Sequence, residues 1–361
     1  MSHALVVGKF YPPHAGHHYL INKAIRECEK VTVAACYSSV ENIAIEDRQA
    51  WLYDAHGERS ETFEVITVKD DTPVAYTDET WGFFLDALME SLDWQGELGY
   101  PDTIYSGESY APEFAERLDR RYDDRIARDL SDSFPDKGTV RAIVVDRNEI
   151  GFQISATAVR SKPQAYWDYL APATRAGLAK RVVICGAEST GTTTLAKALA
   201  QHYRTTVVPE YGRHFDWAVG KHHKWTHADF IHIAEEQKRW EDKLARVSEN
   251  GLLICDTDEF ATAMFSEVYL GEQTPEIIDI AKLSAADLYI VTSDLGVPFE
   301  DDGTRHDSGR RPWMTQWFAT NLPSNTAEVF GDHETRLKVA IQLIDKMLQQ
   351  GWHIEDPIEY R

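Results

Sequence analysis

Short apolar runs alternate along the chain with segments whose apolar residues recur at helical spacing. Residues 4–7 and 31–36 are apolar runs of strand length, and between them Ile21, Ala24 and Ile25 share one face of a helix. Two strands that flank a helix and are joined to it by short links are typical of a parallel sheet. The same reasoning predicts strands at residues 63–68, 103–106 and 140–145, a helix at 79–92 and a charged, solvated helix and loop at 113–136.

A second series of the same kind begins at residues 182–185. A helix presenting Leu195, Ala198 and Leu199 on one face follows this strand. The pattern then predicts strands at 206–208, 252–255 and 288–292, and a closing helix over 337–348 that Gly351 ends. We therefore expect two tandem, doubly wound α/β domains with parallel sheets, at residues 1–172 and 180–361.

Composition and charge limit the function classes. The 361 residues carry 37 basic and 59 acidic side chains, a net charge of −22, which argues against binding along a nucleic-acid backbone. The four cysteines stand singly, as buried thiols do in a reducing compartment. There is neither a charged leader with an apolar stretch nor an apolar run of membrane-spanning length. We expect a cytoplasmic protein that binds neither nucleic acid nor membrane.

The first candidate site follows the first predicted strand. The segment Gly-Lys-Phe-Tyr-Pro-Pro-His-Ala-Gly-His, residues 8–17, leads from that strand into a helix. Ligands of open α/β sheets bind at the carboxyl ends of strands, and a helix N-terminus favours negative charge. The imidazoles of His14 and His17 can point to the same side of this helix start and stabilise charge on a phosphoryl oxygen. A pair of capping or core histidines is the structural alternative.

A second element lies just before the domain boundary. Residues 154–160 read Ile-Ser-Ala-Thr-Ala-Val-Arg and offer two hydroxyls and a guanidinium, from Ser155, Thr157 and Arg160, at another helix start. Such groups can cradle a polyphosphate, although serine and threonine also cap helices generally. Together with the earlier histidines, the segment indicates a nucleotide site.

These two segments resemble the H-x-G-H and I-S-x-T-x-x-R motifs of the nucleotidyltransferase superfamily. The form G-K-F-Y-P-x-H-x-G-H is similar to the adenylyltransferase half of NadR-type proteins, bifunctional nicotinamide mononucleotide (NMN) adenylyltransferases and ribosylnicotinamide kinases. The resemblance covers nearly the whole chain. It implies a Rossmann-like nucleotidyltransferase domain followed by a P-loop kinase-like domain, and attack of the NMN phosphate on the α-phosphorus of ATP, giving NAD and pyrophosphate.

The resemblance also implies roles for individual residues of the first domain. His14, His17 and Arg160 would be catalytic, with His17 at the α-phosphoryl group. The ATP-binding residues would be Gly8, Lys9, Phe10, His14, Gly16, His17, Ser155, Thr157 and Arg160. Trp81 resembles the family tryptophan that stacks on the nicotinamide ring, a favourable contact for a cationic ring, although a core tryptophan is the alternative. Arg48 is a candidate for the NMN phosphate, against a surface ion pair.

The second candidate site is a loop between a predicted strand and a helix. Residues 186–194 fit the phosphate-binding pattern G-x-x-x-x-G-K-S/T, except that Thr192 stands where the lysine belongs. That lysine normally neutralises the β- and γ-phosphates. The backbone amides and the Thr193 hydroxyl remain available to phosphate and magnesium. A strand-to-helix turn without a nucleotide is the alternative. The predicted ATP contacts are Gly186, Glu188, Ser189, Thr190, Gly191, Thr192, Thr193 and Thr194.

Other segments resemble the kinase half of the same family. Asp256 ends a predicted strand as a Walker-B acid does; it would act catalytically, holding Mg²⁺ through water with Thr193 or accepting the proton of the substrate's 5′-hydroxyl. The predicted riboside and lid residues are Glu210, Arg213, Asp258, Asp302, Arg305 and Arg310. We expect Arg305, Arg310 or both to supply the positive charge that the loop lacks.

The leading interpretation is an enzyme of NAD salvage that uses ATP and Mg²⁺ and converts nicotinamide riboside to NMN and NMN to NAD. The sequence is compatible with a homo-oligomer and does not decide it. One alternative keeps the adenylyltransferase and makes the second domain a nucleotide-binding regulatory module. Another is a nucleotidyltransferase acting on a different phosphate. An NAD-sensing regulator is a further alternative, since some NadR-type proteins carry an extra N-terminal helix-turn-helix domain; we do not expect one here, because the first predicted strand begins by Ala4. A class I aminoacyl-tRNA synthetase would need an anticodon-binding region and a basic surface.

Overall fold

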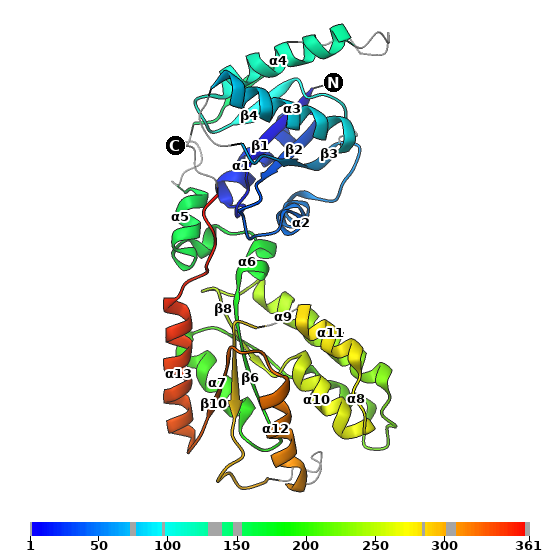
Figure 1. Cartoon of the computed structure of the whole chain (residues 1–361), viewed down its shortest axis with the longest axis vertical. Helices are drawn as coiled ribbons and strands as arrows, with labels where there is room; N and C mark the ends of the chain where they lie inside the picture. Colours follow the sequence, from blue (N-terminus) through cyan, green and yellow to red (C-terminus); the bar gives the residue numbers. More distant parts are fainter. Residues whose placement is uncertain are drawn as a thin grey trace. The chain divides into compact units, whose positions relative to one another are not determined.

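The computed structural model of the chain describes residues 2–72, 77–95, 98–128, 139–146, 154–283, 286–300 and 308–357. The chain divides into two compact units. One unit comprises Met1–Thr174 together with His353–Arg361, and the other comprises Arg175–Trp352. Each contains a parallel five-stranded sheet and its covering helices (Figure 1).

The first unit has the strand order β3-β2-β1-β4-β5. Its strands are β1 His3–Gly8, β2 Lys30–Tyr37, β3 Phe63–Lys69, β4 Thr103–Ser106 and β5 Arg141–Val144. Its helices are α1 Ala15–Glu27, α2 Ile45–His56, α3 Asp78–Gln95, α4 Ala111–Arg128, α5 Ala156–Ser161 and the 3-10 segment η1 Pro163–Tyr169. Because the strand order changes direction between β1 and β4, the carboxyl end of β1 lies at the position where such sheets bind ligands.

The first sheet is covered on both faces. Along β1, Ala4 and Val6 pack into a core with Ile21 of α1, whereas Leu5 packs into a core with Leu88 of α3 on the other face. A strand buried on both faces reads as a continuous apolar run, which is why β1 could be predicted. Helix α4 also contributes a buried face to this unit, so the described part of the region predicted to be solvated is amphipathic; residues 129–136 of that prediction lie outside the described residues.

The second unit has the strand order β10-β9-β6-β8-β7. Its strands are β6 Lys180–Gly186, β7 Thr206–Val208, β8 Leu252–Asp256, β9 Leu288–Thr292 and β10 Thr326–Val329. Its helices are α7 Thr192–Tyr203, α8 Tyr211–Val219, α9 His227–Ala245, α10 Glu259–Leu270, α11 Pro275–Leu283, η2 Ser308–Arg310, α12 Arg311–Asn321 and α13 His333–Gln349. Helix α6 Pro172–Leu178 spans the boundary between the units.

The register of the second sheet places its functional loops at one edge. Gly186 pairs with Thr292 of β9, and Ile184 pairs with Asp256 of β8. The loop after β6 therefore begins beside the carboxyl ends of β8 and β9. The predicted fold class, two doubly wound α/β domains in tandem, is confirmed.

Candidate active sites

The histidines of the first unit are built into the start of α1. His14 is the N-cap residue: its Nδ1 accepts a hydrogen bond from the Gly16 amide at 3.1 Å, and His17 Nδ1 accepts one from the His14 amide at 3.3 Å. The two rings stack with their centroids 3.8 Å apart. Since a backbone N–H donates to each Nδ1, each neutral ring carries its proton on Nε2. Both imidazoles are thus fixed as Nε2–H donors.

The protonation state of these rings follows from their burial. Burial lowers the pKa of His14 to about 4 and the pKa of His17 well below its usual range. Both rings are therefore neutral near pH 7, and they would act on a phosphate as hydrogen-bond donors rather than as cations. A Cβ on Gly16 would lie 3.0 Å from the His14 ring, so the glycine lets this ring sit close to the helix start.

The segment 154–160 meets the histidines at this helix start. Ser155 caps α5 through a 3.1 Å bond from the Ala158 amide, and Ile154 approaches to 3.5 Å of the position that a Cβ on Gly16 would take. Arg160 Nη1 donates to the Tyr11 carbonyl at 2.9 Å and Nη2 donates to Thr157 Oγ1 at 3.2 Å. The structure thus brings together the two motifs that lie about 140 residues apart in the sequence.

The C-terminal segment lies against the same group. Arg160 Nε is 3.5 Å from Asp356 Oδ1, and the Asn42 amide donates to the His353 carbonyl at 2.7 Å. Sequence reasoning missed these contacts, because neither Asp356 nor His353 belongs to a recognisable motif. A polyphosphate on Arg160 would compete with the Asp356 carboxylate.

Two other predicted phosphate contacts are paired with one buried carboxylate. Lys9 Nζ lies 3.0 Å from Glu41 Oε1, and Arg48 Nη1 lies 2.9 Å from Glu41 Oε2. The Arg48 side chain is 1% exposed and also donates to the Lys9 carbonyl at 2.9 Å. The structure gives Arg48 an ion pair, as in the alternative interpretation, but a buried one. The hydrogen bond from Arg48 to the Lys9 carbonyl also connects α2 to the turn after β1.

Trp81 lies in the core between α3 and α4. Its ring stacks on Phe114 with a centroid distance of 5.6 Å, and the Arg117 guanidinium carbon lies 5.6 Å from the ring centroid. Trp81 is 6% exposed. The cation that contacts this indole in the structure is therefore Arg117.

The loop after β6 has the geometry of a phosphate-binding loop. A Cβ at Gly186 would lie 2.3 Å from Thr292 Oγ1, so only glycine fits beside β9. Gly191 adopts φ +87 as the N-cap of α7, another conformation suited to glycine. The Thr190 hydroxyl donates to the Ala187 carbonyl at 2.6 Å. The two glycines and the Thr190 hydrogen bond thus shape the loop ahead of the α7 N-terminus, which favours anions.

Arg336 of α13, which sequence reasoning missed, is hydrogen-bonded to this loop and to the segments that follow β9 and β10. Its guanidinium donates to the carbonyls of Thr190, Ser293 and Gly331 at 2.7, 2.8 and 2.7 Å. The residue is 5% exposed, and burial lowers the pKa of its guanidinium. All three nitrogens of Arg336 are therefore engaged with backbone.

Thr193 and Asp256 fit the requirements of a magnesium site. Burial raises the pKa of Asp256, while the hydroxyls of Thr193 and Thr192 and the Arg213 guanidinium oppose that shift. Thr193 Oγ1 and Asp256 Oδ1 are buried, and neither makes a hydrogen bond of regular geometry within the described part of the chain. Hard oxygen donors of this kind suit Mg²⁺, which keeps several waters of its own. No cluster of three or more metal-ligating side chains occurs among the residues that the structure describes.

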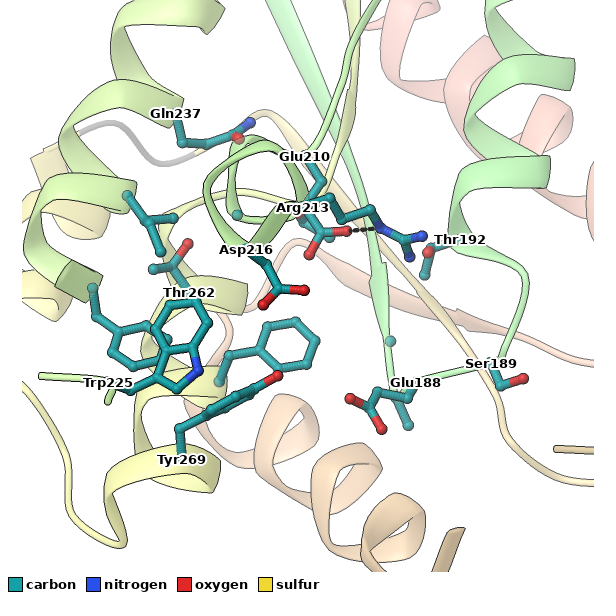
Figure 2. Close-up of a pocket in the computed structure, with 17 residues that line it drawn as sticks. Glu188, Ser189, Thr192, Glu210, Arg213, Asp216, Trp225, Gln237, Thr262 and Tyr269 are labelled. Carbon is teal, nitrogen blue, oxygen red and sulfur yellow. Dashed lines mark hydrogen bonds and ion pairs between the residues drawn. The ribbon is translucent and has the colours of Figure 1, made fainter. Parts of the chain in front are cut away.

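A pocket opens between the loop, α8, α9 and α10 (Figure 2). Figure 2 shows the carboxylates of Glu188, Glu210 and Asp216 around this pocket, with the rings of Trp225 and Tyr269 along one side. The Trp225 and Tyr269 ring centroids are 5.0 Å apart in edge-to-face contact. Burial raises the pKa of Glu210, and the Arg213 guanidinium partly offsets that shift. The pocket combines aromatic surface with negative charge.

Sequence reasoning singled out two of the lining residues, Glu210 and Arg213, as riboside or lid residues. It gave four others as ATP contacts, Gly186, Glu188, Ser189 and Thr192, and it missed Asp216, Trp225 and Tyr269. The missed residues come from three separate segments, and no local pattern connects them.

Two further predicted lid and riboside residues, Asp258 and Arg310, do not line this pocket. Asp258 caps α10 through a 3.0 Å bond from the Ala261 amide and does not line this pocket. Arg310 Nη1 donates to the Val268 carbonyl at 2.7 Å and also lies outside the lining. Asp302 and Arg305 fall outside the described residues. The predicted roles of Asp258 and Arg310 therefore stay predictions.

Comparisons with known proteins agree with this architecture. A family model described as an AAA domain matches residues 181–336. Two curated relatives, both called trifunctional NAD biosynthesis/regulator protein NadR, are 24% identical to the chain. The alignment to the Salmonella typhimurium protein covers 96% of this chain and 84% of the relative, and that to the Escherichia coli protein covers 95% and 83%.

Two solved structures share the fold over the whole chain. They are a NadR protein in complex with NAD and AMP-PNP, with a TM-score of 0.69, and a NadR protein in complex with NR, with a TM-score of 0.70. Each is 22% identical, and each alignment covers 98% of both chains. Fold and loop define a two-domain α/β protein of the nucleotide-binding class. The curated relatives make the chain similar in sequence to NadR-type proteins, and the two solved structures share its fold. Among the residues described, no helix is long and apolar enough to cross a membrane.

Proposed function

We propose that the first unit transfers AMP from ATP to NMN and thereby makes NAD. The observation that carries the proposal is the meeting of two neutral Nε2–H imidazoles, His14 and His17, with the Arg160 guanidinium at the end of β1. In this arrangement, neutral imidazoles that donate hydrogen bonds through Nε2–H lie at the same helix start as the Arg160 cation. This arrangement suits a triphosphate whose α-phosphorus is attacked.

The chemistry requires little of the protein beyond positioning and charge stabilisation. An oxygen of the NMN phosphate forms a bond to the α-phosphorus, the bond from that phosphorus to the α–β bridging oxygen breaks, and pyrophosphate leaves. The attacking phosphate is already ionised, so no general base is needed. The His17 Nε2–H would stabilise the α-phosphoryl oxygens, and Arg160 with Thr157 would hold the β- and γ-phosphates.

A test of this activity supplies NMN, ATP and Mg²⁺ and measures NAD formation. We expect His17→Ala to lower kcat by at least about 100-fold, the usual loss on removing one donor from a developing oxyanion. His222→Ala, which removes an exposed histidine of the second unit, is the control and should leave the rate unchanged. An undiminished rate for His17→Ala would overturn the proposal.

A second activity is favoured by the pocket of Figure 2, and we propose that the second unit phosphorylates nicotinamide riboside. This nucleoside carries a cationic aromatic ring, which the rings of Trp225 and Tyr269 and the carboxylates around them suit. The name of the relative solved with NR supports the same substrate.

In the second reaction the 5′-hydroxyl oxygen forms a bond to the γ-phosphorus of ATP as the bond to the β–γ bridging oxygen breaks and ADP leaves. Mg²⁺ bound by the Thr193 hydroxyl, with Asp256 contacting it through water, would neutralise charge on the β- and γ-phosphates. The Asp256 carboxylate would then remain free to accept the hydroxyl proton.

A single time course separates the two activities. The protein is incubated with nicotinamide riboside, ATP and Mg²⁺, and products are identified at intervals. NMN followed by NAD supports both proposals. NAD formed only when NMN is supplied supports the adenylyltransferase alone, with the second unit as a nucleotide-binding regulatory module.

A further inference from the structure

The second unit lacks a positive charge at the position where a phosphate-binding loop normally carries one. Thr192 begins α7 at the lysine position of the loop pattern, and its hydroxyl bears no charge. During transfer, negative charge builds on the γ-phosphoryl oxygens and on the departing β–γ bridging oxygen. Backbone amides and Mg²⁺ do not replace the positive charge that a lysine at position 192 would bring. An active site therefore needs a cation from another element.

Three other arginines of the second unit donate hydrogen bonds to backbone carbonyls. All three guanidinium nitrogens of Arg336 donate to carbonyls, and Arg310 donates to the Val268 carbonyl in α10. Arg311 is 6% exposed, donates through Nη1 alone to the Val297 carbonyl at 3.0 Å, and lines neither pocket beside the loop. Using any of these for a phosphate would cost hydrogen bonds that support the fold.

Arg213 of α8 lines both pockets beside the loop. Two pockets flank the loop, one with the aromatic rings and one over the α7 N-terminus, and the linings share only Ser189, Thr192 and Arg213 among the described residues. Figure 2 shows the Arg213 guanidinium extending towards Thr192, while its Nε pairs with Glu210 Oε2 at 2.5 Å. The Arg213 side chain is 55% exposed, so it can move towards a ligand.

We propose that Arg213 replaces the missing loop lysine and binds the γ-phosphate during transfer. This inference rests on the proposed kinase activity of the second unit. Arg213 stands between the pocket for the hydroxyl substrate and the pocket for the nucleotide, where the phosphoryl group passes. Its planar guanidinium can contact two phosphate oxygens at once, as arginine fingers do, and the Glu210 carboxylate fixes its approach.

The decisive experiment combines Arg213→Ala with Thr192→Lys in the full-length protein. We expect Arg213→Ala to lower kcat for riboside phosphorylation by at least about 100-fold. In the double variant, the restored loop lysine should return kcat to within about tenfold of the wild type. A purely structural role for Arg213, such as orienting Glu210, would not be rescued by a lysine on α7.

A binding measurement provides a readout that does not depend on turnover. Calorimetric titration with AMP-PNP and with ADP gives the preference for the third phosphate, which Arg213→Ala should reduce at least fivefold. Arg239→Ala is the matched control, because Arg239 of α9 is 68% exposed and pairs with Glu236 at the same i,i+3 spacing. Neither Arg239 nor Glu236 lines a described pocket.

The outcomes separate this inference from the proposed activity. Unchanged kcat and unchanged triphosphate preference in Arg213→Ala would overturn the inference while leaving the kinase intact. An inert wild type that Thr192→Lys activates would also overturn it, because the loop would then be uncompensated. If neither protein phosphorylates the riboside, the kinase proposal fails, and the AMP-PNP to ADP ratio still decides whether Arg213 contacts the third phosphate.

Discussion

Replacing Arg336 by methionine tests whether one buried guanidinium holds the nucleotide loop to the sheet. Methionine keeps most of the length and apolar volume of the side chain but offers no donor. In the structure, Arg336 donates to carbonyls that follow three different strands: Thr190 after β6, Ser293 after β9 and Gly331 after β10. The substitution leaves all three carbonyls without this donor.

The expected loss can be worked from these contacts. Hydrogen bonds to a charged group contribute about 1.5–3 kcal/mol each, which gives roughly 4.5–9 kcal/mol for three. Desolvation of the guanidinium offsets part of this sum, so we expect the free energy of unfolding to fall by about 3–5 kcal/mol. For a unit of this size, each kcal/mol lowers Tm by about 2–4 °C, so the midpoint should fall by roughly 6–20 °C.

Urea titration and thermal unfolding of the full-length protein measure this loss, and hydrogen exchange localises it to the loop after β6. Lys338→Met is the control, because Lys338 is an exposed cation on the same helix and should change stability by less than about 0.5 kcal/mol. If Arg336→Met lost no more stability than the control, the three carbonyl bonds would contribute nothing net and the reasoning would be wrong.

Two further predictions concern the second unit. Gly186→Ala places a methyl group 2.3 Å from Thr292 Oγ1, so it should cost at least about 2 kcal/mol of stability and weaken AMP-PNP binding; unaltered thermal unfolding would contradict the steric argument. Burial raises the pKa of Glu241 to about 8 from its ordinary 4.5, so the folded state holds a proton that the unfolded state releases. Its contribution to stability is therefore full below about pH 4.5 and is lost as the pH rises to about 8, and Glu241→Gln should flatten this part of the stability profile measured by urea titration. An equally steep profile in the variant would assign the dependence to other groups.

The strands were the most predictable part of the fold, for a physical reason. A parallel strand covered on both faces must be apolar throughout, so β1, β6 and β8 appear in the sequence as short uninterrupted runs. Strand β10 lies at a sheet edge and is only partly buried, and its sequence Thr-Ala-Glu-Val carries no such signal. Helix α8 buries none of its nine residues, although Phe215 on one of its faces contacts Trp225 and His232, and no helix was predicted there.

The residues of the candidate sites were also predictable only where they are contiguous with a strand in the sequence. Loops that follow a strand directly, such as the residues after Gly8 and Gly186, could be found because the strand, the glycine and the helix start are contiguous. Arg336 lies on an amphipathic helix, where an arginine is ordinarily expected to face solvent, and only the tertiary structure shows it beneath the loop. Trp225 and Tyr269 meet only after α9 and α10 have packed.

The threonine at position 192 and the arginine at position 213 are best understood as one arrangement. A lysine on α7 would direct its ammonium into the space towards which the Arg213 guanidinium extends in Figure 2. Two like charges about 4 Å apart repel by about 1 kcal/mol in water and about 4 kcal/mol near a protein surface. A neutral hydroxyl at 192 removes that repulsion before any phosphate arrives, so the exchange of lysine for threonine favours the approach of Arg213. The effects of Thr192→Lys and Arg213→Ala should then be strongly non-additive, as expected for residues that share one partner.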